Sequence, residues 1–303
     1  MNGAPPRGLE RRSVHPDVLI DGKPTAAGKL RRRLQRLLVS QHEHEEAMLE
    51  RRIRARPPVT RPNTVALVSP KGGVGKTTST FLAGNLLAGH LNVRAIAIDA
   101  NPDFGTLARL APDHRRSKRS LADLLADLDT INTAAELTPY VSRLPTGLHV
   151  LSAPDDAELT AGLGPERYGE LVAFLAMFYE VMLLDLGTGV AGPLARFATG
   201  RADQLVLVTT PEWVTSTVVL EALSYVQHEH TTVVINKSRL ESAAVIAVED
   251  RFRAEHLHRA VTIPYDEQLA TMLDSGTYAL EALGWRTRLG VKRLGLAVAD
   301  QLV

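Results

Sequence analysis

The sequence has no cysteine among its 303 residues. It can therefore form neither a disulfide bridge nor a thiolate zinc site, and it offers no cysteine ligand to an iron–sulfur cluster. Long apolar runs are also missing, since no stretch reaches the roughly 18 residues that a membrane-spanning helix needs. The N-terminus is polar and rich in proline, without the apolar core of a signal peptide, so we expect a cytoplasmic protein.

The chain also has almost no net charge, because 35 Lys+Arg face 34 Asp+Glu. This balance hides an asymmetry. Residues 1–61 hold 14 basic and 7 acidic side chains, whereas residues 62–303 hold 21 and 27. The difference predicts a basic arm over 1–61 and a mildly acidic domain over 62–303. Basic arms are typical of proteins that meet nucleic acid, anionic lipid or an acidic partner.

The arm itself divides into two parts. Residues 1–25 are rich in proline and glycine, which predicts disorder. Leucines at helical spacing from Ala26 to Arg56 predict a helix or helical hairpin, which Pro57 and Pro58 end. Two interpretations are open: a solvated helix that packs on the domain or on a second copy, and contact with DNA or an anionic membrane. The side chains considered for that contact are Arg31, Arg32, Arg33 and Arg36.

Strands and helices alternate after Pro62. Apolar runs such as 65–68 and 205–208 predict strands that are buried on both faces, as a parallel sheet requires. The alternation predicts an α/β fold, a doubly wound and mostly parallel sheet with helices on both faces and ligands at the carboxyl ends of the strands. The expected strands are Thr64–Ser69, Val93–Asp99, Leu148–Ser152, Val181–Asp185, Gln204–Thr209, Thr232–Ile235 and Ala260–Ile263. The expected helices are Lys76–Gly89, Leu121–Leu128, Thr133–Leu137, Glu166–Phe178, Thr215–Gln227, Ser242–Glu255 and Thr287–Val303.

The strongest motif is Ser69-Pro-Lys-Gly-Gly-Val-Gly-Lys-Thr-Thr78, which follows an expected strand and opens an expected helix. This context is that of a phosphate-binding loop, whose glycines turn backbone N–H groups toward a β-phosphate at the helix N-terminus. We expect Lys76 to bridge the β- and γ-phosphates, Thr77 to offer its hydroxyl to Mg²⁺ and Thr78 to reach the α-phosphate. The residues expected to hold the nucleotide here are Gly72, Gly73, Val74, Gly75, Lys76, Thr77 and Thr78.

Two positions depart from the ordinary loop pattern. Pro70 stands where the first glycine would be, and a second lysine, Lys71, precedes the glycines. With these features K-G-G-V-G-K-T-T resembles the deviant Walker A ATPases, the ParA/MinD family, and the resemblance covers about residues 63–303. It implies an ATPase that closes as an ATP-dependent homodimer, in which Lys71 reaches the phosphates held by the partner chain, much as an arginine finger does.

Two acidic strand ends fit the same resemblance. Asp99 ends one expected strand, and the family's second aspartate, which positions the attacking water, is replaced by Asn101. Asparagine orients water but cannot accept its proton, so we expect slow, partner-stimulated turnover, with Asp103 able to compensate. The strand that ends at Asp185 resembles a Walker B strand. The resemblance therefore implies Mg²⁺ near Thr77, Asp99 and Asp185.

Two further segments are expected at the base. The motif N-K-x-D of guanine-binding proteins reads Asn236-Lys-Ser-Arg239 here, so the carboxylate that accepts hydrogen bonds from guanine is missing and ATP is favoured over GTP. By resemblance, Asn236 contacts adenine, and Pro264 and Tyr265 belong to the loop that covers the base.

Two basic clusters keep several interpretations. Arg115, Arg116, Lys118 and Arg119 precede Ser120, the expected N-cap of the next helix, and they belong either to a solvated loop or to a contact with DNA or a partner. The C-terminal helix mixes basic and small apolar residues. Packing on the sheet, binding to DNA and binding to a membrane are all open for it.

The favoured function is a Mg²⁺-ATP-dependent switch that positions or partitions DNA or a cellular machine and is reset when a partner protein stimulates hydrolysis. ParA-like members bind nonspecific DNA, which is favoured here and implies association with the nucleoid. The first alternative is a MinD-like, membrane-associated ATPase of flagellar or secretion systems. The second is a scaffold that binds nucleotide, hydrolyses it weakly or not at all, and recruits partners through the basic arm.

Overall fold

The computed structural model describes residues 41–101, 106–156, 159, 163–226, 228–239, 243–257 and 259–303. Its contacts divide the chain between Glu43 and His44. The larger unit therefore includes residues 44–54 of a helix that spans 41–54, and the boundary expected at 61/62 stays a prediction. The expected disorder of 1–25 and the expected contacts of the arginines at 31–36 fall outside the described residues.

A single sheet of eight strands forms the centre of the larger unit, in the order β3-β4-β2-β5-β1-β6-β7-β8. Every neighbouring pair is parallel except β3 and β4, which are antiparallel. The doubly wound, mostly parallel sheet expected from the sequence is thus confirmed. The strands are β1 (Asn63–Ser69), β2 (Ala95–Ala100), β3 (Ser142–Arg143), β4 (His149–Leu151), β5 (Val181–Thr188), β6 (Gln204–Thr209), β7 (Thr231–Ser238) and β8 (Ala260–Pro264).

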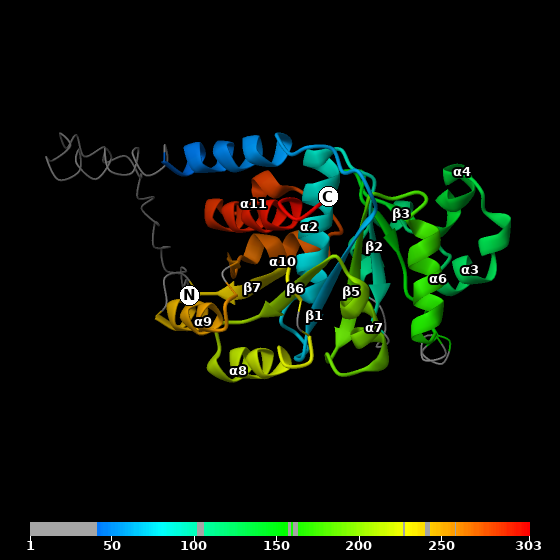
Figure 1. Ribbon diagram of the computed structural model, residues 1–303. Coiled ribbons are helices and arrows are strands. Elements are labelled where there is room, and N and C mark those ends of the chain that lie inside the picture. Colours follow the sequence, from blue (N-terminus) through cyan, green and yellow to red (C-terminus); the bar gives the residue numbers. More distant parts are fainter. Residues whose placement is uncertain are drawn as a thin grey trace, which may run out of the picture. The chain divides into compact units, whose positions relative to one another are not determined.

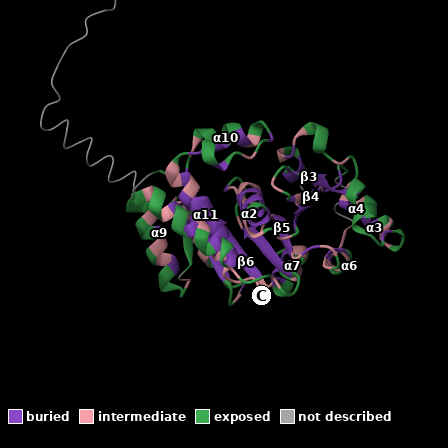
Figure 2. Cartoon of the chain, turned by 90° about the horizontal axis from the view of Figure 1, so that it is seen from above, coloured by how far each residue is buried: buried purple, intermediate pink, exposed green. Residues whose placement is uncertain are grey.

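Helices cover both faces of this sheet (Figure 1), and the buried strands run between them (Figure 2). One apolar core joins the sheet to α2, α10 and α11, and a second core joins its other face to α3, α6, α7, α8 and α9. The α-helices are α2 (Lys76–Leu91), α3 (Leu121–Ala126), α4 (Ala134–Leu137), α6 (Pro165–Leu175), α7 (Pro193–Arg201), α8 (Trp213–Ala222), α9 (Ala243–Ala254), α10 (Glu267–Asp274) and α11 (Trp285–Ala299). Short 3₁₀ turns are η1 (Leu107–Leu110), η2 (Asp113–Arg115), η3 (Leu128–Thr130), η4 (Thr138–Tyr140) and η5 (Leu280–Ala282).

Local signals explain where several helices start. Ser120 caps α3 as expected, because its hydroxyl accepts from the N–H of Asp123 in a capping box. Helices α7 and α10 were not expected from the sequence. Both nevertheless carry a start signal, a proline at the first position of α7 and the Asp266 cap of α10.

Helix α11 packs against the sheet, which was one of the three interpretations left open for the C-terminal helix. Two glycines allow the close approach. A Cβ on Gly290 would lie 2.7 Å from the carbonyl oxygen of Thr262, and a Cβ on Gly295 would collide with the side chain of Leu86 in α2. None of the helices in the described part of the chain is both long and apolar enough to cross a membrane.

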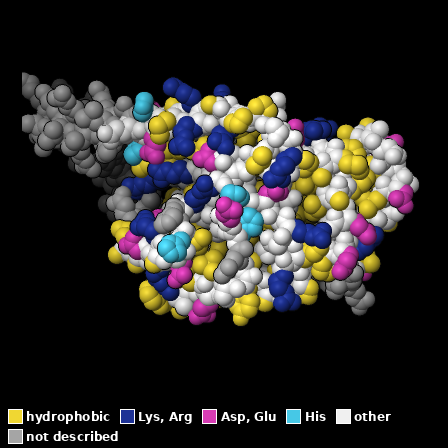
Figure 3. Space-filling view, viewed as in Figure 1, with side chains coloured by type: hydrophobic (Ala, Val, Ile, Leu, Met, Phe, Trp, Pro, Cys, Tyr) yellow, Lys and Arg dark blue, Asp and Glu magenta, His cyan; other side chains and the backbone are white. Residues whose placement is uncertain are grey.

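Buried ion pairs fasten the 44–54 segment of the N-terminal helix to α11. Lys292 is only 1% exposed, and its Nζ lies 2.5 Å from Oε1 of both Glu46 and Glu50. Arg288 donates to both carboxylate oxygens of Glu46, at 2.8 and 3.1 Å. Basic and acidic side chains intermingle over this part of the surface (Figure 3).

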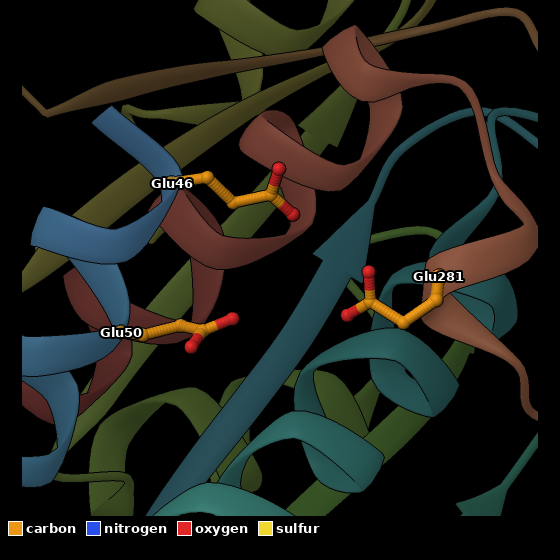
Figure 4. Close-up of side chains that lie close together, drawn as sticks. All are labelled: Glu46, Glu50 and Glu281. Carbon is orange, nitrogen blue, oxygen red and sulfur yellow. The ribbon is translucent and has the colours of Figure 1, made fainter. Parts of the chain in front are cut away.

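Three carboxylates gather at this junction (Figure 4), with Glu46 and Glu50 on the N-terminal helix and Glu281 on η5. Burial by itself would raise the pKa of Glu46, but hydrogen bonds and positive charge from Arg288 and Lys292 hold that pKa below its usual value. The two cations therefore balance the acidic group, and the cluster serves as an ion-paired joint between the helices.

We expect Glu46→Ala to lower the free energy of unfolding by about 3 kcal/mol, because it removes one of the two carboxylates that balance the buried Lys292. The matched control is Glu45→Ala on the same helix, whose ion pair with Arg293 is partly exposed and should contribute at most about 1 kcal/mol. Urea unfolding measures both values. Equal losses of unfolding free energy in the two variants would show that the buried ion pairs contribute no more to stability than the exposed one.

Candidate nucleotide-binding site

The phosphate-binding loop leaves the carboxyl end of β1, between β5 and β6, and enters α2. Gly73 (φ 74°) and Gly75 (φ 99°) adopt left-handed backbone conformations, which glycine accepts at little cost. Gly75 is the N-cap of α2, and no side chain among the described residues caps this helix. The N–H groups of the first turn are therefore left to bind an anion.

The end of β7 clamps this loop. Asn236 is buried, and its side-chain amide donates to the carbonyl oxygen of Val74 at 2.8 Å. The same amide would collide with any Cβ at Gly75, so the position tolerates only glycine. Lys237 donates from Nζ to the carbonyl oxygen of Gly73 at 2.7 Å. This contact was not expected from the sequence, although Lys237 directly follows Asn236 in the motif that resembles N-K-x-D.

Lys71 is held within its own chain. Its Nζ donates to Oγ1 of Thr215 in the first turn of α8 at 2.8 Å, and its backbone N–H donates to Oγ of Ser69 at 3.2 Å. No sequence signal had marked Thr215, because α8 is remote from the loop along the chain and meets it only in the fold.

The expected acidic residues come together at the sheet edge. Asp99 and Asp185 are opposite one another in the register of β2 and β5, and β5 lies next to β1, the strand from which the loop leaves. Both side chains are buried. Asp99 already accepts from the N–H of Leu107 at 2.9 Å and from that of Asn101 at 3.3 Å. Asp103 lies outside the described residues.

The chemistry of this corner fits a divalent cation. Asp185 is 2% exposed, and its Oδ1 has no hydrogen-bond partner among the described residues. An unpaired buried carboxylate oxygen is costly, and a cation would relieve that cost. Together with the Thr77 hydroxyl, Asp185 supplies the hard oxygen ligands that Mg²⁺ prefers.

The pKa values report the same desolvation. The pKa of Asp185 is raised to about 7, mainly because the group is buried; the nearby Asp99 adds to the rise, and the hydroxyl of Thr77 and the charge of Lys76 oppose it. Burial also raises the pKa of Asp99 to about 6. For Lys76, burial lowers the pKa, and the charge of Asp185 partly counters this. Each shift is one that a bound cation and phosphates would reverse.

The segment expected over the base lies beside β7. The N–H of Tyr265 donates to the carbonyl oxygen of Ser238 at 2.9 Å, which fixes the loop after β8 next to the end of β7. Pro264 is buried, whereas Tyr265 is 60% exposed. The structure thus brings Asn236, Pro264 and Tyr265 to neighbouring strand ends, and Asn101 follows β2 directly.

Without nucleotide or Mg²⁺, we expect Asp185→Asn to stabilise the protein at pH 8 by on the order of 2–4 kcal/mol. The pKa of Asp185 is higher in the folded state than in the unfolded state. Protonation of this group therefore favours folding, and that stabilisation is lost as pH rises from about 4, near the unfolded pKa, to about 7, the folded pKa. Thermal melts from pH 5 to 8 measure this loss, with the exposed Asp129→Asn as control. A variant that follows the unsubstituted protein at every pH would contradict the expected titration.

Known proteins match this chain over the same region. Residues 65–279 match the model of the CobQ/CobB/MinD/ParA nucleotide binding domain. The ESX-1 secretion-associated protein EspI of Mycobacterium tuberculosis is 30% identical over 172 residues, which are 57% of this chain and 25% of EspI. The septum site-determining protein MinD of Synechocystis is 32% identical over 148 residues, 49% of this chain and 53% of MinD. The chain thus spans a quarter of one relative and about half of the other.

Solved structures share the fold. A ParA family ATPase from Chlorobium tepidum superposes with a TM-score of 0.63 at 22% identity, over 78% of this chain and 98% of that one. MinD from Pyrococcus horikoshii in complex with Mg-ADP gives a TM-score of 0.59 at 20% identity, over 77% and 94%. Because the family model spans most of the sequence and includes the phosphate-binding loop, the chain belongs to the CobQ/CobB/MinD/ParA family of nucleotide-binding domains.

Proposed function

We propose that this protein is a Mg²⁺-ATP-dependent switch ATPase that dimerises to position or partition DNA or a cellular machine. The observation that carries the proposal is the meeting of the phosphate-binding loop with the paired carboxylates Asp99 and Asp185 at one sheet edge. Family membership supports nucleotide binding, and the missing guanine acceptor at Arg239 supports ATP.

Different residues of the loop would contact different parts of a bound triphosphate. The N–H groups of Gly73 to Lys76 surround the β-phosphate, and Lys76 reaches toward the γ-phosphate. Thr77 and Asp185 would hold Mg²⁺, which would supply positive charge beside the phosphate oxygens. Asn101 orients the attacking water without taking its proton, which makes hydrolysis slow until a partner improves the geometry.

The side chain of Lys71 would have two alternative binding partners. In the single chain it is hydrogen-bonded to Thr215, and in the proposed closed dimer it leaves Thr215 for the phosphates of the partner chain. The bond to Thr215 joins a charged donor to a neutral hydroxyl and contributes about 1.5–3 kcal/mol, whereas a bond to phosphate joins two opposite charges and is stronger. Binding of ATP on both chains then favours closure, and hydrolysis removes the ligand that holds Lys71 across the interface.

Nonspecific DNA is the surface we favour, because residues 1–61 carry 14 basic and 7 acidic side chains. The likeness to a secretion-associated protein of Mycobacterium tuberculosis favours a second candidate, the positioning of a secretion machine. A poorly hydrolysing scaffold is the third candidate, for which the amide at Asn101 is the motivating feature.

Steady-state turnover with ATP and Mg²⁺ separates these candidates. We expect slow hydrolysis above the Lys76→Ala blank and faster hydrolysis with DNA, because DNA would concentrate the closed dimer. Stimulation by anionic vesicles alone would favour the membrane-bound alternative. Turnover equal to the blank under every condition would refute the ATPase, and a large gain in Asn101→Asp would then support the scaffold.

A mixing experiment tests whether Lys71 acts across the dimer. Lys71→Ala and Lys76→Ala should each be inactive alone, whereas an equal mixture should recover about a quarter of the unsubstituted rate, since half of the dimers are mixed and each has one complete site. Recovery must depend on total protein concentration. A mixture that gives only the summed rates of the two variants would show that Lys71 acts within its own chain.

A further inference from the structure

A basic groove of about 710 Å³ lies along β3 and shares no residue with the candidate nucleotide-binding site. Two separate segments line it, residues 114–118 before α3 and residues 138–147 around β3. Arg143 enters from the second segment, so the fold adds a cation to the basic cluster of the first segment. Among the described residues that line the groove there is no carboxylate.

Hydrogen bonds hold the basic segment in place. The N–H of Ser117 donates to Oγ of the buried Ser142 at 2.9 Å, and the hydroxyl of Ser117 donates to the carbonyl oxygen of Pro139 at 2.7 Å. The N–H of Arg119 in turn donates to that hydroxyl at 3.0 Å. The loop is thereby fixed to η4 and β3 before any ligand arrives, which reduces the entropy cost of binding.

The charges of the groove are only partly balanced. Arg119 beside it pairs with Asp127 at 3.4 Å, and Arg116 within it pairs with Asp113 at 3.0 Å. The other three cations are exposed and form no ion pair with a described carboxylate. They are Arg115, Lys118 and Arg143.

We propose that this groove binds the phosphate backbone of a DNA duplex through Arg115, Lys118 and Arg143. The inference rests on the proposed function, for which it names a docking site on the folded domain in addition to the arm. A lipid surface fits less well, because membrane insertion needs exposed apolar side chains. The large exposed hydrophobic residues within the described ranges all lie outside the groove.

The test compares two triple variants of the full chain. Arg115→Ala/Lys118→Ala/Arg143→Ala removes the three cations from the groove, and Arg196→Ala/Arg201→Ala/Arg259→Ala removes the same charge from exposed positions outside both the groove and the arm. Fluorescence anisotropy with a mixed-sequence duplex and saturating ATP gives the Kd between 50 and 200 mM salt. We expect the slope of log K against log salt to fall by about 2.7, or 0.9 for each lost phosphate contact, so the groove variant should bind on the order of a hundredfold more weakly at 50 mM salt and a few-fold more weakly at 200 mM. The control variant should keep most of its affinity for DNA at 50 mM salt and most of its salt slope.

Equal changes in the two variants would overturn the proposal, as would an unsubstituted protein that binds no DNA at 50 mM salt. A groove variant that loses binding to phosphatidylglycerol vesicles or to poly-glutamate, yet keeps its affinity for DNA, would also overturn it. Turnover is measured on the same samples. ATPase activity equal to the Lys76→Ala blank refutes the proposed function by itself, whereas normal turnover with unchanged DNA binding refutes only the groove.

Discussion

The buried position of β1 is the constraint on which this molecule depends. This strand pairs on both sides, with β5 and β6, and its residues are buried from end to end. Residues Val65 to Leu67 pair with both neighbours, so the chain is held straight there and changes direction where the strand ends. The glycine-rich loop begins at that point, and its left-handed turns bring it back to open α2.

Neighbouring strands complete the site because parallel strands end at one edge. β5 and β2 bring Asp185 and Asp99 there in register, and β7 brings Asn236 and Lys237, whose side chains hold the carbonyl oxygens of the loop. The loop is therefore fixed by hydrogen bonds from β7 before any ligand binds. In the proposed function this preformed loop would lose little entropy when phosphate binds.

Buried charge is treated in two different ways in this fold. Lys292 is buried against the N-terminal helix, where Glu46 and Glu50 compensate it, so the charge serves the structure. Asp185 is buried, and one of its oxygens has no partner in the described part of the chain; its raised pKa marks a destabilising group that a ligand could relieve. Both groups are removed from water. Lys292 is balanced by carboxylates of the same chain, whereas the charge of Asp185 remains available to bind a ligand.

The sequence by itself determined the α/β class, the parallel sheet and the phosphate-binding loop, because apolar runs and glycine spacing are local signals. It also named Lys71, Lys76, Asp99 and Asp185 from short motifs. It did not reveal that Thr215 accepts a hydrogen bond from Lys71, that Lys292 forms an ion pair with Glu46, or that Arg143 lines the same groove as the basic segment 114–118. These contacts join residues that are far apart in the chain, and only the strand order and helix packing of the tertiary structure decide which of them meet.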